Sequence, residues 1–244
     1  IAQYKNGGWP QFFPVKDSAE EKLLDHIAPY SMHITYNDDA MVNTMQFLED
    51  IFSDNEAYTS MQITKEVKTK AKKAFDTGIE CFLKTQIIVN NKPTVWCAQH
   101  NEITFAPAKA RAYELPSFSG YESVGIVMML MELNNPSKEI IASVNGAIDW
   151  FENHKIEGIK IETEIDKDGK RNRIVVEDKN AATLWARFYN LKTEKPFFSS
   201  RDGIEKDSLA EISYERRNGY SWYTARPAEA LKKYPDWAKK WHVK

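Results

Sequence analysis

The chain has 244 residues, of which 42% are hydrophobic and 28% charged, a balance typical of folded globular proteins and not of disordered chains. Its formal net charge of −2 provides no strong field that would attract nucleic acid or an anionic lipid surface. No apolar run approaches the ~18 residues of a membrane-spanning helix. The two cysteines, Cys81 and Cys97, form no CxxC motif, so neither a disulfide framework nor a structural zinc site is expected.

The N-terminal part of the chain predicts an ordered loop followed by two helices. Residues 1–36 combine Gly and Pro with aromatic side chains, which indicates a structured loop. The first helix opens at Asn37 or Asp38, because apolar residues then recur at spacings of three and four. A second helix follows Thr64, with a lysine-rich face that we interpret as solvated surface.

The middle of the chain predicts two more helices and then a β hairpin. The third helix is expected to start at Ser119, which fits a capping box with Glu122, and a fourth follows Pro136. Apolar and charged residues then alternate over residues 159–165, as in a half-buried strand. Residues 174–176 provide the return strand across a turn rich in Asp and Gly.

The C-terminal part returns to helical patterns. Ser208 and Glu211 fit a second capping box, the helical pattern ends at Gly219, and a short last helix covers Pro227–Tyr234. No composition shift marks a second domain. Periodicity therefore predicts a mainly α, single-domain protein over residues 1–244 with one small β hairpin, and it does not identify a function.

The arginines are unevenly distributed along the chain. All eight lie in the second half or close to it: Arg111, Arg171, Arg173, Arg187, Arg201, Arg216, Arg217 and Arg226. One interpretation is ordinary surface solvation. The other is a site that holds carboxylates or phosphates, since the planar guanidinium binds such groups through two parallel hydrogen bonds.

Asn37, Asp38 and Asp39 stand together at the start of the first predicted helix and allow two interpretations. Asn and Asp are favoured N-cap residues, and acidic side chains in the first turn suit the helix dipole. Adjacent carboxylates and an amide are also the hard oxygen ligands that Ca²⁺ prefers, although the spacing is not that of an EF-hand loop. The sequence leaves both interpretations open.

Other candidates are equally ambiguous. Arg187 and Arg201 flank an aromatic turn and could, with Arg111, recognise carboxylates along an acidic polymer, or each could form a surface ion pair. His100 fits a hydrogen-bonded structural histidine or a base. The chain lacks GxSxG, HExxH, P-loop and GxGxxG motifs, so covalent nucleophile and nucleotide-binding classes are not indicated.

Eight short motifs, in this order, resemble the pectate lyases of polysaccharide lyase family 10. The resemblance runs from Asn6 to about Trp241. Each motif is weak alone and together they are specific: NGGWPQ, ITYNDDAM, KTQ, WCAQH, KARAYELPS, ARFY, RDG and ERRNGY.

The resemblance implies a fold, a reaction and a partner. The fold expected from it is an (α/α)3 toroid of helical hairpins. The reaction is calcium-dependent anti β-elimination on α-1,4-polygalacturonate, which gives 4,5-unsaturated oligogalacturonides. The protein is then expected to be secreted or periplasmic and monomeric, with an acidic polysaccharide as partner and neither nucleic acid nor membrane.

The resemblance also implies roles for individual residues. Arg111 in KARAYE corresponds to the base that removes the proton. Asp38 in TYNDDAM corresponds to the calcium ligand, with Asp39 beside it as the second choice. Arg187 in ARFY and Arg201 in RDG correspond to arginines that bind substrate carboxylates.

Weaker assignments and two departures complete this comparison. Lys84 in KTQ is a further substrate-binding candidate, and Asn6 in KNGGWP is expected to face the substrate near the metal. Family members usually have Asp where this chain has Asn101, which would alter the electrostatics of the site. Helical sequence usually precedes the NGGWP segment, so residues 1–244 are expected to form a single catalytic domain whose N-terminal part is missing from the sequence.

Two rival functions remain open at this point. A glycoside hydrolase with a helical toroid would use two carboxylates, for example Asp38 or Asp39 with Glu114 or Glu122. A non-catalytic uronan-binding protein would keep the arginines and aromatic residues and yield no product.

Overall fold

The computed structural model describes residues 2–13, 29–53 and 55–243. Within these residues six α-helices and four short 3-10 helices are present. The α-helices are α2 (Ala40–Phe52), α3 (Lys65–Thr85), α4 (Glu122–Glu132), α5 (Lys138–Asn153), α6 (Tyr214–Gly219) and α7 (Pro227–Lys240). The 3-10 helices are η1 (Pro29–Met32), η2 (Asn37–Asp39), η3 (Glu56–Met61) and η4 (Leu209–Glu211).

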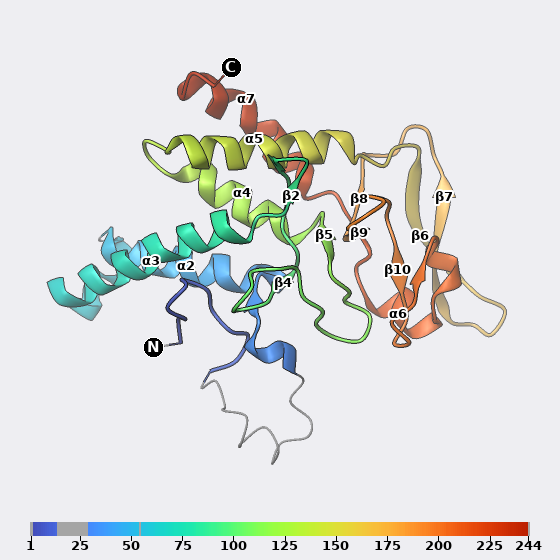
Figure 1. The fold of residues 1–244 in the computed structure, drawn as a ribbon. Coiled ribbons are helices and arrows are strands. Elements are labelled where there is room, and N and C mark those ends of the chain that lie inside the picture. The colour runs from blue at the N-terminus through green and yellow to red at the C-terminus, as the bar shows by residue number, and fades with distance from the viewer. Residues whose placement is uncertain (1, 14–28, 54, 244) are drawn as a thin grey trace, which may run out of the picture.

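Helix α4 lies at the centre of the helical part, between the α2–α3 pair and α5 (Figure 1). It also contacts α7, so neighbouring elements cover it on all sides and most of its residues are buried. A helix in this position is expected to be apolar all round. Helices α3 and α5 each begin at a hydroxyl cap. The Thr64 side chain accepts a hydrogen bond from the Val67 backbone, and Ser137 does the same for Ile140.

The strands form six two-stranded antiparallel sheets among the described residues. The pairs are β1 (Ile34–Thr35) with β4 (Gln99–His100), β2 (Ile88–Val89) with β3 (Lys92–Pro93), β5 (Ser117–Ser119) with β9 (Phe188–Asn190), β6 (Ile159–Ile165) with β7 (Arg171–Glu177), β8 (Trp185–Ala186) with β12 (Tyr223–Thr224), and β10 (Phe198–Ser199) with β11 (Glu205–Lys206).

Three of these pairs join segments that are far apart in the chain. The β1–β4 pair sets Thr35 opposite Gln99, and the β5–β9 pair sets Ser119 opposite Phe188. The β8–β12 pair sets Trp185 opposite Thr224. These pairings bring η2, the start of α4 and the β8–β9 connection together, so they build the site described below.

The prediction of an (α/α)3 toroid of helical hairpins with one small β hairpin is wrong. The structure is 43% helical and 18% strand, and its strands are distributed over six small sheets. Most of the missed strands have only two or three residues, too few to show a period of two in the sequence. The predicted hairpin is confirmed as β6 and β7, because its strands have seven residues each.

Helix boundaries differ from the prediction at three places. The first helix begins at Ala40 and not at Asn37 or Asp38, because these residues form the 3-10 turn η2. The third helix begins at Glu122, because Ser119 belongs to β5 and its hydroxyl instead accepts hydrogen bonds from the backbone of Tyr121 and Glu122. The last helix continues beyond Tyr234 through Lys240, with Pro235 inside it. The capping box of Ser208 and Glu211 is confirmed at η4.

Two hydrophobic clusters fill the molecule. The larger one packs the helices together, and the smaller one lies under the strand-rich part and is built largely from aromatic residues. Ala186 belongs to the first cluster and Phe188 to the second, so the residue between them, Arg187, lies where the two clusters meet. Among the described residues, no helix has the length and apolar character to cross a bilayer. Cys81 and Cys97 are both buried and free.

Candidate active site

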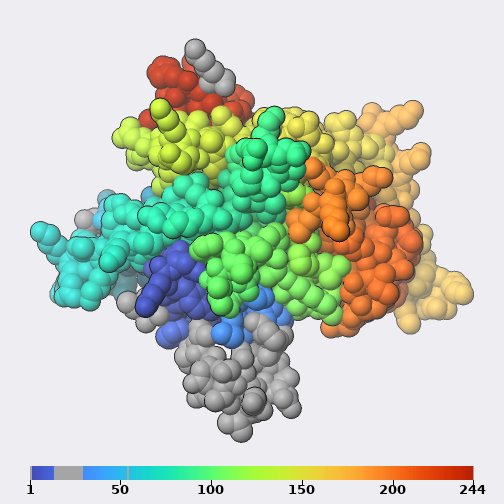
Figure 2. All heavy atoms as spheres, in the orientation of Figure 1, coloured from blue at the N-terminus to red at the C-terminus, as the bar shows by residue number. Residues whose placement is uncertain are grey.

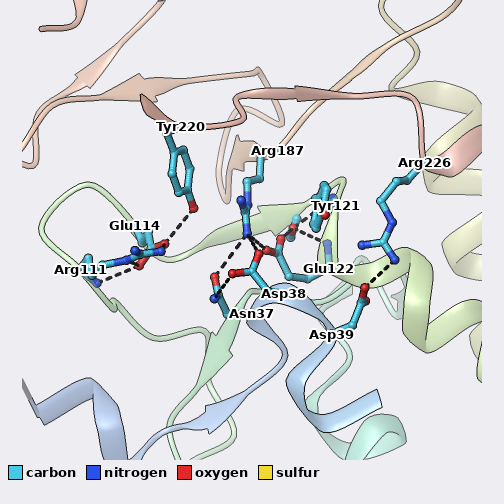
Figure 3. Close-up of polar contacts among 11 residues, drawn as sticks. Asn37, Asp38, Asp39, Arg111, Glu114, Tyr121, Glu122, Arg187, Tyr220 and Arg226 are labelled. Atoms are coloured by element: carbon cyan, nitrogen blue, oxygen red, sulfur yellow. Dashed lines mark hydrogen bonds and ion pairs between the residues drawn. The ribbon is translucent and has the colours of Figure 1, made fainter. Parts of the chain in front are cut away.

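The η2 turn holds two consecutive residues in the left-handed region of backbone conformation. Asp38 has φ 50° and Asp39 has φ 60°. Aspartate tolerates this region better than most residues. The turn directs the two carboxylates to different partners (Figure 3). The Asp38 carboxylate meets Arg187, and the Asp39 carboxylate meets Arg226.

Arg187 is buried at the centre of the site, where β8 passes into β9. Its Nη2 donates to Asp38 Oδ1 at 2.9 Å and is ion-paired with Glu122 Oε1. The Glu122 side chain is fully buried and that of Arg187 is 5% exposed, whereas that of Asp38 is 65% exposed. Burial lowers the pKa of the Arg187 guanidinium, but the charges of Glu122, Tyr220 and Asp38 and the hydrogen bond to Glu122 together outweigh it, so the pKa lies above its usual range. Arg187 is therefore permanently charged.

Asp39 and Arg226 form a second ion pair beside the first. Arg226 Nη2 donates to Asp39 Oδ2 at 2.7 Å. The other oxygen, Oδ1, is buried and has no hydrogen-bond partner in the described part of the chain. It faces Gly125 of α4 so closely that a Cβ there would lie 2.3 Å away, so a larger residue at this position would require the Asp39 side chain to shift.

Arg111 lies on the loop between β4 and β5 and is bound to Glu114. Its Nε donates to Oε2 of Glu114 at 2.8 Å and its Nη2 to Oε1 at 2.5 Å. The Tyr220 hydroxyl donates to the same Oε1 at 2.8 Å. These hydrogen bonds and the charge of Glu114 hold the pKa of Arg111 above its usual range. The contact favours the charged guanidinium, which is the reverse of what a base requires in the resting protein.

Arginine and tyrosine side chains alternate across the site (Figure 3). Arg187 lies over the Tyr220 ring at 4.7 Å and over the Tyr121 ring at 4.6 Å, measured from Cζ to the ring centroid. Arg226 lies 4.4 Å from Tyr121, and Arg111 lies 5.8 Å from Tyr220. We call this arrangement the arginine–tyrosine row: Arg111, Tyr220, Arg187, Tyr121 and Arg226. Rings between guanidinium groups separate like charges and stabilise each by cation–π contact.

The other predicted residues lie in separate contacts. Arg201 is exposed and donates to Glu215 at 3.1 and 2.8 Å. The Lys84 ammonium group pairs with Glu80 on the solvent side of α3. Neither Lys84 nor Asn6 makes a hydrogen bond or ion pair with the arginine–tyrosine row in the described residues.

Asn6 and Asn101 organise the chain near β4. Asn6 Nδ2 donates to the carbonyl oxygen of Glu102 at 2.6 Å, which fastens the N-terminal segment beside the loop after β4 (Figure 2). Asn101 Oδ1 accepts from the backbone of Ile103 and Thr104, at 3.0 and 2.8 Å. Asn101 therefore stabilises a turn. His100 is fully buried between the Cys97 backbone and a carbonyl group, and burial lowers its pKa to about 4, which fits the structural interpretation.

The sequence did not indicate the tyrosines of the row or Arg226 as site residues, and Glu114 and Glu122 were candidates for the site only as the acids of a hydrolase. Tyr220 is within the ERRNGY motif, which could have indicated it. For Tyr121 and Arg226 the sequence contains no such signal, because their contacts join segments separated by 66 residues of chain or more.

What the site offers to a calcium ion is the exposed carboxylate of Asp38, one oxygen of which already accepts a hydrogen bond from Arg187. No group of three or more His, Cys, Asp or Glu side chains converges among the described residues. Asp38 nevertheless offers a carboxylate that is 65% exposed, and Ca²⁺ commonly completes a shell with water and substrate oxygens. Asp39 offers the buried Oδ1 that lacks a hydrogen bond, although this atom faces α4.

Comparison with known proteins defines the class of this chain as a lyase. A model of the family described as pectic acid lyase matches residues 1–231, and the chain therefore belongs to the pectic acid lyase family. None of the curated proteins matches it.

Two solved structures of the family 10 polysaccharide lyase from Cellvibrio cellulosa are similar to this chain. One is a mutant in complex with trigalacturonic acid, with 33% identity and a TM-score of 0.82 over 98% of this chain and 69% of that one. The other is the same lyase, with 32% identity and a TM-score of 0.82 over 99% of this chain and 69% of that one. The resemblance found in the motifs is thereby confirmed.

Proposed function

We propose that this chain is a pectate lyase that cleaves α-1,4-polygalacturonate by anti β-elimination and leaves 4,5-unsaturated oligogalacturonides. The observation that carries the proposal is the arginine–tyrosine row next to the exposed Asp38 carboxylate in a member of the pectic acid lyase family. Several fixed guanidinium groups suit a polymer that carries a carboxylate on every sugar. The trigalacturonic acid bound by the mutant Cellvibrio lyase is a ligand of this class.

Arg111 is the proposed base. Its neutral guanidine takes the proton from C5 of a galacturonate, and the electron pair of the C5–H bond forms the C4=C5 double bond. The C4–O bond breaks with its electron pair on oxygen, and the released sugar takes up a proton from water. The Arg111 side chain is 41% exposed, so substrate can approach it. No covalent intermediate is needed, in agreement with the missing nucleophile motifs.

The remaining roles concern charge and binding. A calcium ion, when bound, would offset the negative charge on the uronate carboxylate and so acidify the neighbouring C5–H bond. Asp38 is the proposed ligand, with Asp39 as the second. Arg187 and Arg201 are proposed to bind substrate carboxylates.

Lys84 and Asn6 are proposed as further substrate contacts at the margins of the site. Residues 1–244 are proposed to act as a single catalytic domain, as a monomer, on an extracellular or periplasmic polysaccharide. Neither nucleic acid nor a membrane is proposed as a partner.

One assay tests the proposal against its rivals. The protein is incubated with polygalacturonate, and the ultraviolet absorbance of the 4,5-unsaturated product is followed with and without a chelator. Absorbance that the chelator abolishes and added calcium restores is the expected result. Reducing sugar without absorbance would instead indicate a hydrolase that uses two carboxylates, and binding without turnover would indicate a non-catalytic uronan-binding protein.

A further inference from the structure

Glu114 is a buried carboxylate that accepts hydrogen bonds from four donor groups. Its side chain is 3% exposed. Both oxygens are used by Arg111, and the Arg111 backbone N–H donates to Oε2 as well, at 3.1 Å. The Tyr220 hydroxyl completes the set. A buried carboxylate with this many donors is held in one orientation, and it in turn holds its partners.

The contact fixes which edge of the Arg111 guanidinium is free. Nε and Nη2 both point to Glu114 (Figure 3). Nη1 makes no hydrogen bond to any residue in the described ranges, and the side chain is 41% exposed. The part of Arg111 that remains for a substrate is therefore the Nη1 group.

The other charged and titratable groups around Arg111 do not replace Glu114. The rings of Tyr113 and Tyr220 lie 5.2 and 5.8 Å from its Cζ. Arg201 and Arg216 approach the same Tyr113 ring at 5.9 and 4.5 Å, but both guanidinium groups are paired with Glu215. Within the described chain, Glu114 is the carboxylate that hydrogen-bonds to Arg111.

We propose that Glu114 is a positioning residue that presents Nη1 of Arg111 to the substrate and, by keeping the guanidinium charged, sets the alkaline pH at which Arg111 becomes a base. This inference rests on the proposed function, in which Arg111 takes the proton. In this proposal Glu114 contacts neither the substrate nor the proton that is transferred from C5 to Arg111.

The test is the pH dependence of kcat/KM for Glu114→Gln, with polygalacturonate as substrate and calcium at saturation. Loss of the negative charge favours neutral Arg111, so the rising limb of the profile is expected to move to lower pH by about 1 unit or more. The maximal kcat is expected to fall, because the amide holds the guanidinium less firmly. A lower rate with the limb unmoved would assign Glu114 a merely structural role and overturn the inference.

A matched control and a conservative variant accompany this test. Glu152 pairs with Lys155 at the same i,i+3 spacing on the surface of α5, so Glu152→Gln should leave the limb in place. Glu114→Asp keeps the charge and shortens the reach, so it should lower kcat while the limb stays near that of the parent protein. If Glu114→Gln does not fold, a limb shifted to lower pH in Glu114→Asp would overturn the inference.

Failure of the inference is distinguishable from failure of the proposed function. Arg111→Ala, which leaves no base at this position, is assayed in parallel. If it retains full kcat, Arg111 is not the base and the proposed mechanism fails. If it loses activity while Glu114→Gln shows an unmoved limb, only the role of Glu114 is overturned.

Discussion

At the scale of single residues, the charged state of the arginines is the central physical question. A guanidinium has a pKa of ~12.5 or more in water, and Glu114 raises the pKa of Arg111 further. A raised pKa means that the charged form is stabilised, so the neutral guanidine that could act as a base is a minor species near pH 7. Proton removal by Arg111 therefore demands alkaline conditions or a cationic environment around the bound substrate.

The first prediction concerns pH. Because the pKa of Arg111 is raised, the fraction of neutral guanidine grows as pH rises, and the rate of lyase activity should increase from neutral into alkaline pH. The profile is obtained from initial rates of unsaturated product at fixed calcium. A maximum clearly below neutrality would exclude Arg111 as the base.

The second prediction concerns the side chain of Arg111. Arg111→Lys keeps the positive charge but loses the planar fork that Glu114 binds at Nε and Nη2. We expect kcat to fall by about 100-fold or more, with a smaller change in KM. Steady-state kinetics at the pH optimum measure both. Retention of most of kcat would mean that charge alone is sufficient at this position.

At the scale of secondary-structure elements, the site exists because short strands join distant segments. Arg187 comes from the β8–β9 connection, Asp38 from η2 and Glu122 from the first turn of α4. The Arg187–Glu122 pair is buried, so each partner depends on the other for its charge. Arg187 is thus part of the folded core of the site as well as a proposed substrate contact.

The third prediction compares two arginines of the site by stability. Arg187→Gln leaves the buried Glu122 without its charged partner and should lower the free energy of unfolding by ~3–5 kcal/mol. Arg201→Gln removes an exposed pair that solvent screens, so it should change the free energy of unfolding far less. Urea denaturation followed by circular dichroism measures both. Equal losses would contradict the burial argument.

At the scale of the whole molecule, the distribution of charge is informative because the net charge is close to neutral. With a formal value of −2, attraction of a polyanion depends on the local row of arginines and not on the overall field. Ion pairs with Asp38, Asp39, Glu114 and Glu122 offset much of this row. A substrate carboxylate that binds to the row therefore competes with one of these internal carboxylates for a guanidinium group.

The fourth prediction follows from this local attraction. Binding of polygalacturonate should weaken as ionic strength rises, because dissolved salt screens the attraction between exposed charges. The screening length falls to about 3 Å at 1 M salt. We expect KM to increase between low salt and about 0.5 M salt at saturating calcium, while kcat changes less. Steady-state kinetics at each salt concentration are sufficient. A KM independent of salt would argue against carboxylate recognition by the row.

The sequence by itself determined the elements whose signals are local. The helix after Thr64, the β6–β7 hairpin and the capping box at Ser208 are visible because their patterns repeat within a few residues, and the order of the motifs identified the family. Local signals do not report which distant segments pair, and for that reason the small sheets and the true fold class were missed.

Only the tertiary structure decided how the candidate residues are arranged. Adjacent in sequence, Asp38 and Asp39 turn to different arginines because both adopt left-handed backbone conformations. Arg187 is buried against Glu122, 65 residues away in the chain. Such pairs form when folding has removed water and brought separate elements together, and their energies depend on that burial. A residue's type is read from sequence, but its partner and its charge are set by what surrounds it.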